Sequence, residues 1–139
     1  MNRFQWNGLV VAAIFLGTAG TVFAVSLKAG NGSLEPGASG AVTTKYDGPY
    51  WEVPDFGAPY QYYVATSKFT CKGLTPGSTY YLWGGVATQF GSDRYPITSF
   101  AADATGFAAG TGTSGPEAKY DYYFVEDAVG NWVMWSPHN

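Results

Sequence analysis

Apolar and polar side chains alternate over short stretches of this chain, and no stretch after residue 26 has the 3.6-residue spacing of a helix. The clearest alternation covers residues 61–72 (QYYVATSKFTCK). Side chains two positions apart point the same way along a strand. One face would carry Tyr63, Ala65, Phe69 and Cys71, and the other Tyr62, Thr66, Lys68, Thr70 and Lys72. This pattern predicts a strand with one face in a core and the other toward solvent.

Further alternating runs are separated by glycine, proline, asparagine and aspartate, a pattern typical of β-sandwiches and barrels. The predicted strands cover residues 41–46, 61–72, 79–83, 86–90, 99–102, 107–111, 119–126 and 131–135. Residues 47–60 (DGPYWEVPDFGAPY) contain three prolines, which cannot donate to a strand ladder, so we predict an irregular loop or edge there. The fold class that follows is all-β, an antiparallel β-sandwich-like domain over residues 41–139.

Three connections carry recognisable turn chemistry. Pro76 presets its own φ, and Gly77 after it tolerates a positive φ. The pattern Asp-Ala-x-Gly occurs at 103–106 and again at 127–130, where aspartate can cap the turn and glycine can take the left-handed conformation. Each of these two turns is predicted to join the strands that flank it into a hairpin.

The N-terminal segment is different in character. Residues 8–24 carry no charge and follow a short region whose one basic residue is Arg3. Val22 and Ala24 are suitable for the −3 and −1 positions of a signal-peptidase site. We predict a signal peptide over 1–24, removed on export, which would leave an extracellular protein with no membrane segment. The alternative is a membrane anchor that is not cleaved. A helix needs about 20 apolar residues to span a membrane, and this segment is shorter and is interrupted by glycines and threonines.

Residues 25–40 are rich in glycine, serine and alanine and are predicted to form a flexible N-terminal arm, with at most one short strand near 26–28. Within this arm, Asn31-Gly32-Ser33 is a glycosylation sequon. Asn31 is therefore a candidate glycosylation site, with a chance match as the open alternative.

Composition limits the partners of the chain. Removal of the signal peptide leaves 115 residues (139 − 24), enough for one domain with a modest core. Only 12% of residues are charged, against about 25% in ordinary soluble domains, while 18% are aromatic. A small domain has more surface than core, so many rings are predicted to lie at the surface. The few scattered basic residues make nucleic acid an unsuitable partner.

Cys71 is the single cysteine, so it cannot form an intramolecular disulfide. Two readings stay open. In an exported protein a lone thiol favours a bond between chains or a free thiol. Its position on the apolar face of 61–72 favours burial, either in the core or in a subunit contact.

Catalytic and metal chemistry find little support in the sequence. His138, the only histidine, lies one residue from the end of the sequence, where a general base is poorly held. Carboxylates in aromatic surroundings, which are Glu52, Asp55, Asp121 and Glu126, lie beside turns or at outward strand positions. Possible calcium donors, which are Asp55, Asp93, Asp103, Glu126 and Asp127, form no dense acidic run. We predict that the chain is not an enzyme and has no catalytic, metal or cofactor site.

Two segments resemble known modules. Leu74-x-Pro76-Gly77-x-x-Tyr80-Tyr81 resembles the loop before a late strand in fibronectin-III-like and immunoglobulin-like surface modules. That resemblance implies that Leu74 plugs the core and that the tyrosine packs across a corner. Residues 100–107 and 122–125 resemble the closing hairpins of similar secreted bacterial and archaeal modules. In composition the chain also resembles the small, β-rich, self-assembling subunits of archaeal or bacterial surfaces, such as sheaths and surface layers.

Two functions from different classes are predicted. The first is an extracellular structural subunit that self-assembles into a cell-surface polymer (sheath, surface layer or filament) through strand edges, aromatic surfaces and, if Cys71 pairs between chains, a disulfide. The second is a secreted carbohydrate-binding module, because sugar rings stack on exposed aromatic side chains. The residues predicted to carry these contacts are Trp51, Tyr60, Tyr62 and Trp83.

Overall fold

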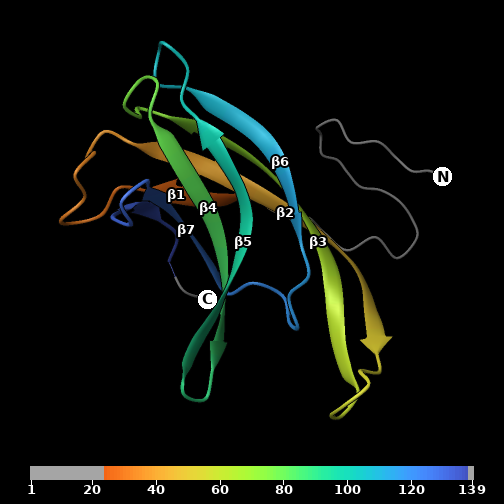
Figure 1. The fold of residues 1–139 in the computed structure, drawn as a ribbon. Helices are drawn as coiled ribbons and strands as arrows, with labels where there is room; N and C mark the ends of the chain where they lie inside the picture. The colour runs from red at the N-terminus through yellow and green to blue at the C-terminus, as the bar shows by residue number, and fades with distance from the viewer. Residues whose placement is uncertain (1–23, 138–139) are drawn as a thin grey trace.

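A computed structural model describes residues 24–137 as one antiparallel sheet of eight strands (Figure 1). The strands are β1 (Val25–Lys28), β2 (Ser39–Glu52), β3 (Tyr60–Lys72), β4 (Thr79–Thr88), β5 (Gly91–Ala101), β6 (Ala108–Ser114), β7 (Tyr122–Asp127) and β8 (Trp132–Trp135). The all-β prediction is confirmed for this range, in which no helix is available to cross a membrane. The predicted signal peptide, apart from Ala24, and His138 lie outside the described residues.

The sheet curls until its two end strands approach each other, so it is nearly closed into a barrel. The strand order is β5-β4-β7-β8-β1-β2-β3-β6. β5 and β6 form no ladder with each other, yet a Cβ added to Gly112 of β6 would lie 2.3 Å from the Ile97 carbonyl oxygen of β5. The backbones therefore touch at this seam, and only glycine fits between them.

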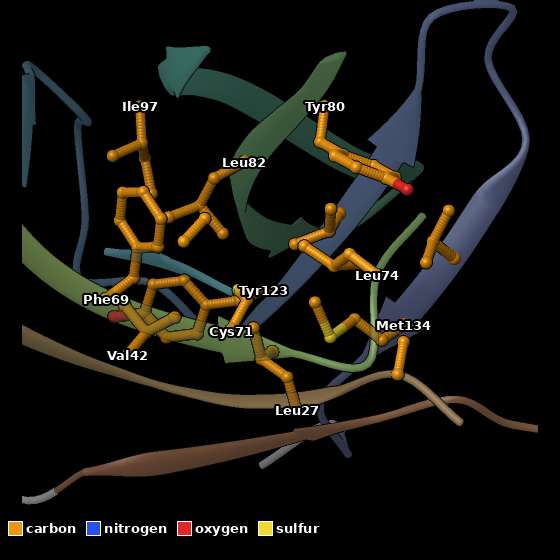
Figure 2. Packing of buried hydrophobic residues seen from close by; sticks show 14 of the residues in the cluster. Leu27, Val42, Phe69, Cys71, Leu74, Tyr80, Leu82, Ile97, Tyr123 and Met134 are labelled. Atoms are coloured by element: carbon orange, nitrogen blue, oxygen red, sulfur yellow. The ribbon is translucent and has the colours of Figure 1, made fainter. Parts of the chain in front are cut away.

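One continuous core fills the inside of the curled sheet (Figure 2). On β3 the predicted alternation is confirmed, since Ala65, Phe69 and Cys71 are buried while Lys68 and Thr70 are exposed. Every strand contributes at least one buried apolar side chain to this core. From the strands other than β3 these include Leu27, Val42, Leu82, Ile97, Ala108, Val125 and Met134. Burial of these side chains is the main favourable contribution to folding of such a domain.

Residues 25–40 belong to the domain rather than forming a flexible arm. β1 lies in the interior of the sheet, between β8 and β2, and Leu27 at its centre is buried. The short strand expected near 26–28 is present, but it is paired on both sides. In the connection that follows, the Ser33 hydroxyl donates to the Val133 carbonyl oxygen at 2.7 Å. Glycine and serine here mark turns that are fixed by tertiary contacts.

The irregular loop predicted over 47–60 is much shorter in the structure. β2 continues to Glu52, so only residues 53–59 connect it to β3. Pro49 lies where the register of the β2–β3 pairing shifts, between Asp47 and Tyr50. A bulge leaves a residue unpaired, so a proline without an N–H is tolerated there. The loop alternative was wrong for residues 47–52, because Pro49 does not end the strand. The edge alternative agrees with the structure, since β2 pairs with β3 alone beyond Val42.

Leu74 and Tyr80 hold the corner between β3 and β4. Leu74 is buried in the core, and the Tyr80 ring is fully buried. The Tyr80 hydroxyl accepts a hydrogen bond from the Thr75 N–H at 3.0 Å and donates to the Glu35 carboxylate at 2.7 Å. Because Glu35 precedes β2, these bonds tie two separate connections together.

Both Asp-Ala-x-Gly segments form the same capped turn. Asp103 Oδ1 accepts hydrogen bonds from the N–H groups of Thr105 and Phe107 and from the Thr105 hydroxyl. These bonds lower the pKa of Asp103, and the bond from the Thr105 hydroxyl has the largest effect. Asp127 Oδ1 accepts in the same way from two N–H groups. Gly106 and Gly130 have φ of 82° and 92°. Only the second turn joins a paired hairpin, β7–β8; the predicted pairing of 99–102 with 107–111 was wrong, because β5 pairs with β4 and β6 with β3.

Candidate assembly surface

Two hairpins, β2–β3 and β4–β5, extend beyond the curled part of the sheet (Figure 1). Residues 47–52 of β2 are exposed on both faces, and so are residues 87–94 around the β4–β5 turn. Each hairpin ends in an exposed phenylalanine, Phe56 in one and Phe90 in the other, both 93% exposed. The ends of these hairpins are therefore apolar surface that the described chain leaves uncovered.

The bulge in β2 decides which side chains share a face of the β2–β3 hairpin. Before the bulge Asp47 pairs with Val64, and after it Tyr50 pairs with Tyr62. Two residues of β2, Gly48 and Pro49, therefore oppose one residue of β3, and the alternation of β2 is inverted beyond this point. As a result Tyr50 points to the outer face of the sheet, and Trp51 points to the inner side.

Tyr50, Tyr60 and Tyr62 form a row on the outer face of this hairpin. The ring centres of Tyr50 and Tyr62 are 5.8 Å apart, and those of Tyr60 and Tyr62 are 6.4 Å apart. The Tyr50 hydroxyl donates to Asp47 Oδ2 at 2.8 Å, and this hydrogen bond to a carboxylate raises the pKa of Tyr50. The structure thus brings Tyr60 and Tyr62 together, and with them Tyr50, which sequence reasoning missed.

Trp51 and Trp83 lie elsewhere. Trp51 is on the opposite face of the same hairpin and is 67% exposed, while Val53 in the adjacent connection is 73% exposed. Trp83 is on β4, which is separated from β2 in the strand order by β7, β8 and β1. The four aromatic residues singled out from the sequence therefore do not form one platform.

Trp83 belongs to a second aromatic cluster, on the outer face of β4, β7 and β8. Its ring is parallel to that of Phe124 (6.1 Å, 3°), and Phe124 stacks on Trp132 (4.3 Å, 14°). The Arg94 guanidinium lies 5.5 Å from the Phe124 ring centre and 3.9 Å from the Glu126 carboxylate. Phe124 is fully buried by this arrangement, whereas the Trp83 Nε1 atom is buried without a hydrogen-bond partner. The cluster covers the outside of the sheet as a small second core.

Tyrosines fill the part of the main core next to the extended hairpin. The Tyr123 hydroxyl is 2.5 Å from Thr44 Oγ1, which is 2.8 Å from Ser67 Oγ, and the Tyr46 hydroxyl accepts from the Tyr120 N–H at 2.9 Å. Burial raises the pKa of Tyr120 to about 12 and that of Tyr46 still further. These hydroxyls are satisfied inside the domain, so their role is packing.

Cys71 lies in the core, 1% exposed, and burial raises the pKa of its thiol to about 12. Gly40 faces it across the β2–β3 ladder, and a Cβ there would approach the Cys71 sulfur to 3.1 Å. Of the two readings left open by the sequence, this geometry favours packing; a disulfide between copies would require β3 to leave the domain.

Asn31 is exposed in the turn between β1 and β2, a position accessible to a glycosylating enzyme. Within residues 24–137 no group of three or more histidine, cysteine, aspartate or glutamate side chains is arranged to hold a metal ion. Of the four carboxylates considered for catalysis, Glu126 contacts Arg94, Asp121 accepts from the Ala87 N–H at 2.6 Å, and Glu52 and Asp55 are exposed.

Comparison with known proteins finds no relative for this chain. No family model, no curated protein and no solved structure matches it.

Proposed function

We propose that this protein is an extracellular structural subunit that assembles with copies of itself into a polymer at the cell surface. The observation that carries the proposal is the β2–β3 hairpin, which extends beyond the core with Trp51, Val53 and Phe56 largely exposed. An isolated two-stranded hairpin is at best marginally stable in water and gains stability when its apolar side chains are covered. A partner surface on another molecule would supply that cover.

A second copy is the simplest partner. The two most exposed apolar residues, Phe56 and Phe90, lie at the ends of two separate hairpins, and contacts at more than one site on a subunit are what a polymer requires. Low overall charge works in the same direction, because β proteins use charge to prevent association through edges and faces. Cys71 has no part in this proposal, since it is buried in the domain.

We also propose that the protein is exported by cleavage of its signal peptide, and that its curled sheet is flattened like a β-sandwich. Removal of residues 1–24 would leave Val25, the first residue of β1, at the new N-terminus. Within the curled sheet, Val42 and Phe69 of β2 and β3 share the core with Leu82 of β4. Such packing of two halves of a sheet, together with the Leu74–Tyr80 corner, supports a relation to fibronectin-III-like and immunoglobulin-like surface modules.

The experiment compares two double variants, each of which replaces two exposed apolar side chains with serine. Trp51→Ser with Phe56→Ser removes the apolar end of the β2–β3 hairpin, and Leu34→Ser with Val129→Ser removes exposed apolar side chains elsewhere. Light scattering and negative-stain microscopy should show polymers for the wild type and the control pair, and at least tenfold weaker assembly for the hairpin pair. Equal assembly of both double variants would contradict the role of this hairpin.

A second candidate function is carbohydrate binding, and one observation favours it. Trp132 is 39% exposed at the end of the ring stack, with the polar groups of Glu126 and Arg94 nearby. An exposed indole beside hydrogen-bonding groups suits a sugar ring. Co-sedimentation with insoluble polysaccharides, lost in a Trp132→Ala variant that still folds, would support this function; no retention on any polysaccharide would exclude those polymers as ligands.

A further inference from the structure

Charged residues are segregated along the outer face of β2 and β3, which we call the outer ribbon. Its members follow from the ladder: Ser39, Ala41, Thr43, Lys45, Asp47, Tyr50 and Glu52 on β2, and Tyr60, Tyr62, Val64, Thr66, Lys68, Thr70 and Lys72 on β3. The half near the core carries three lysines and small side chains. The half near the hairpin end carries two carboxylates and three tyrosines. The ribbon is thus basic at one end and acidic at the other.

The basic half continues sideways without any acid. Lys28 of β1 pairs with Ser39 and points to the same face, so four of the seven lysine and arginine residues of the chain lie there. On the other side β6 adds Ala109, Thr111 and Thr113, which pair with Thr70, Lys68 and Thr66. This face of lysine, threonine and alanine is complementary in charge to the acidic half, and its small side chains oppose the large rings of that half.

We propose that two copies of this chain pack face to face through their outer ribbons, in antiparallel orientation about a two-fold axis; this proposal rests on the self-assembly proposed above. A symmetric contact requires a surface that is complementary to itself. The ribbon satisfies this condition, because turning it end over end places its acidic half on the basic half of the partner.

The register of the contact follows from the ladder. We place the two-fold axis at the cross-strand pair Lys45–Thr66, perpendicular to the strands. The pair Glu52–Tyr60 of one copy then lies opposite the pair Ser39–Lys72 of the other copy. Glu52 then faces a serine flanked by Lys72 and Lys28 of the other copy, and Tyr60 lies over Lys72, where a cation can contact a ring.

The other rows match as well. Tyr50 meets Ala41 and Tyr62 meets Thr70, so that large side chains face small ones. Asp47 comes next to Lys68. Lys45 faces its own copy at the axis, and this is the one unfavourable charge pair in the contact.

The size of the ribbon sets the expected strength of association. A strand of 13 residues, as in β3, is about 44 Å long, and two strands are about 10 Å wide, so the footprint is on the order of 450 Å² per copy. Stable dimers bury about 800 Å² per partner. The dimer should therefore be weak by itself, sensitive to salt, and reinforced by the hairpin contacts of the polymer.

Charge reversal with rescue tests this contact. Lys68→Glu with Lys72→Glu, and separately Asp47→Lys with Glu52→Lys, should each weaken the dimer at least tenfold in sedimentation equilibrium at low salt. The variant with all four substitutions should regain association to within about threefold of the wild type, which also shows that it folds. Lys45→Gln should strengthen the dimer. Lys119→Glu, which changes charge away from the ribbon and from both extended hairpins, is the control.

Four results separate this proposal from its alternatives. Loss in both double variants with recovery in the quadruple variant supports it. Polymers that form equally well in the wild type and both double variants overturn the ribbon contact but leave self-assembly intact. In a third outcome, the substitutions leave self-association unchanged, but the variant Lys68→Glu with Lys72→Glu no longer binds heparin. This outcome would mean that the face binds a polyanion instead of a second copy. A wild type that stays monomeric would overturn both proposals.

Discussion

Tyr50 faces Tyr62 across the β2–β3 ladder, with ring centres 5.8 Å apart, because the bulge at Gly48 and Pro49 shifts the register by one residue. Without this shift Trp51 and not Tyr50 would lie on the outer face. The bulge therefore places the tyrosine row of this hairpin, together with its carboxylates, on the outer face and Trp51 on the inner face.

The Tyr80 corner should contribute measurably to stability. Tyr80→Phe removes the hydrogen bonds to the Thr75 N–H and the Glu35 carboxylate while keeping the buried ring. We expect the free energy of unfolding to fall by about 1–3 kcal/mol, because a hydrogen bond to a charged carboxylate is lost, although the Thr75 N–H keeps its bond to Glu35. Urea denaturation measures this, with Tyr81→Phe on the exposed face as the control. Equal stability of the two variants would show that the corner bonds are unimportant.

The seam between β5 and β6 should tolerate no side chain at Gly112. Gly112→Ala places a methyl group against the Ile97 carbonyl, so β6 must move away. We expect a loss of about 1–3 kcal/mol from this overpacking. Gly115→Ala is the matched control, because its Cβ would have no neighbour closer than 3.7 Å. If both variants unfold at the same urea concentration, β5 and β6 do not approach each other closely at Gly112 and Ile97.

Cys71 should be unreactive in the folded protein. Its pKa of about 12 keeps the thiol protonated at neutral pH, and burial blocks reagents. We expect Ellman's reagent to modify it only at the rate of unfolding, and to react at once in guanidinium chloride. Rapid reaction under native conditions, or a reductant-sensitive dimer band, would restore the disulfide reading.

Stability should fall at alkaline pH. Cys71 and Tyr120 have pKa values of about 12 in the folded state, above their ordinary values of 9.0 and 10.0. The unfolded chain therefore loses protons first, and the stabilising effect is complete below about pH 9 and is lost as pH rises toward 12. Thermal unfolding between pH 7 and 11 should show a decreasing Tm above pH 9. A constant Tm over this range would mean that these groups are hydrated in the folded protein.

Local chemistry made part of the fold predictable. Alternation over 61–72 identified the buried face of β3, because the period of a strand is a local property. The two aspartate-capped turns were recognisable for the same reason, since the donor and acceptor groups lie within four residues of one another.

Pairing between distant segments was not predictable in the same way. Nothing in the four residues of β1 indicates that they lie between β8 and β2, and the turn at Asp103 does not reveal that β5 and β6 pair with other strands. The aromatic residues were correctly identified as numerous at the surface, but their grouping depends on the Pro49 bulge and on strand order. Trp83 joined Phe124 and Trp132, residues that the sequence analysis did not single out.

The ring stack of Trp83, Phe124 and Trp132 should stabilise the fold, although Trp132 is partly exposed. Trp132→Ala uncovers the buried Phe124 ring and should lower the free energy of unfolding by about 2–4 kcal/mol. Val129→Ala, an exposed position in the adjacent β7–β8 turn, should change it by less than about 0.5 kcal/mol. Comparable effects of the two substitutions in urea denaturation would contradict a packing role for Trp132.

Sedimentation velocity of the purified wild-type protein, over a hundredfold range of concentration, is the most direct test of self-association. The weight-average sedimentation coefficient should rise with concentration at low salt, through dimers to larger species. Added salt should weaken only the charged ribbon contact and leave the contacts between apolar hairpin ends in place. A single species with the sedimentation coefficient of a monomer at every concentration would contradict the account.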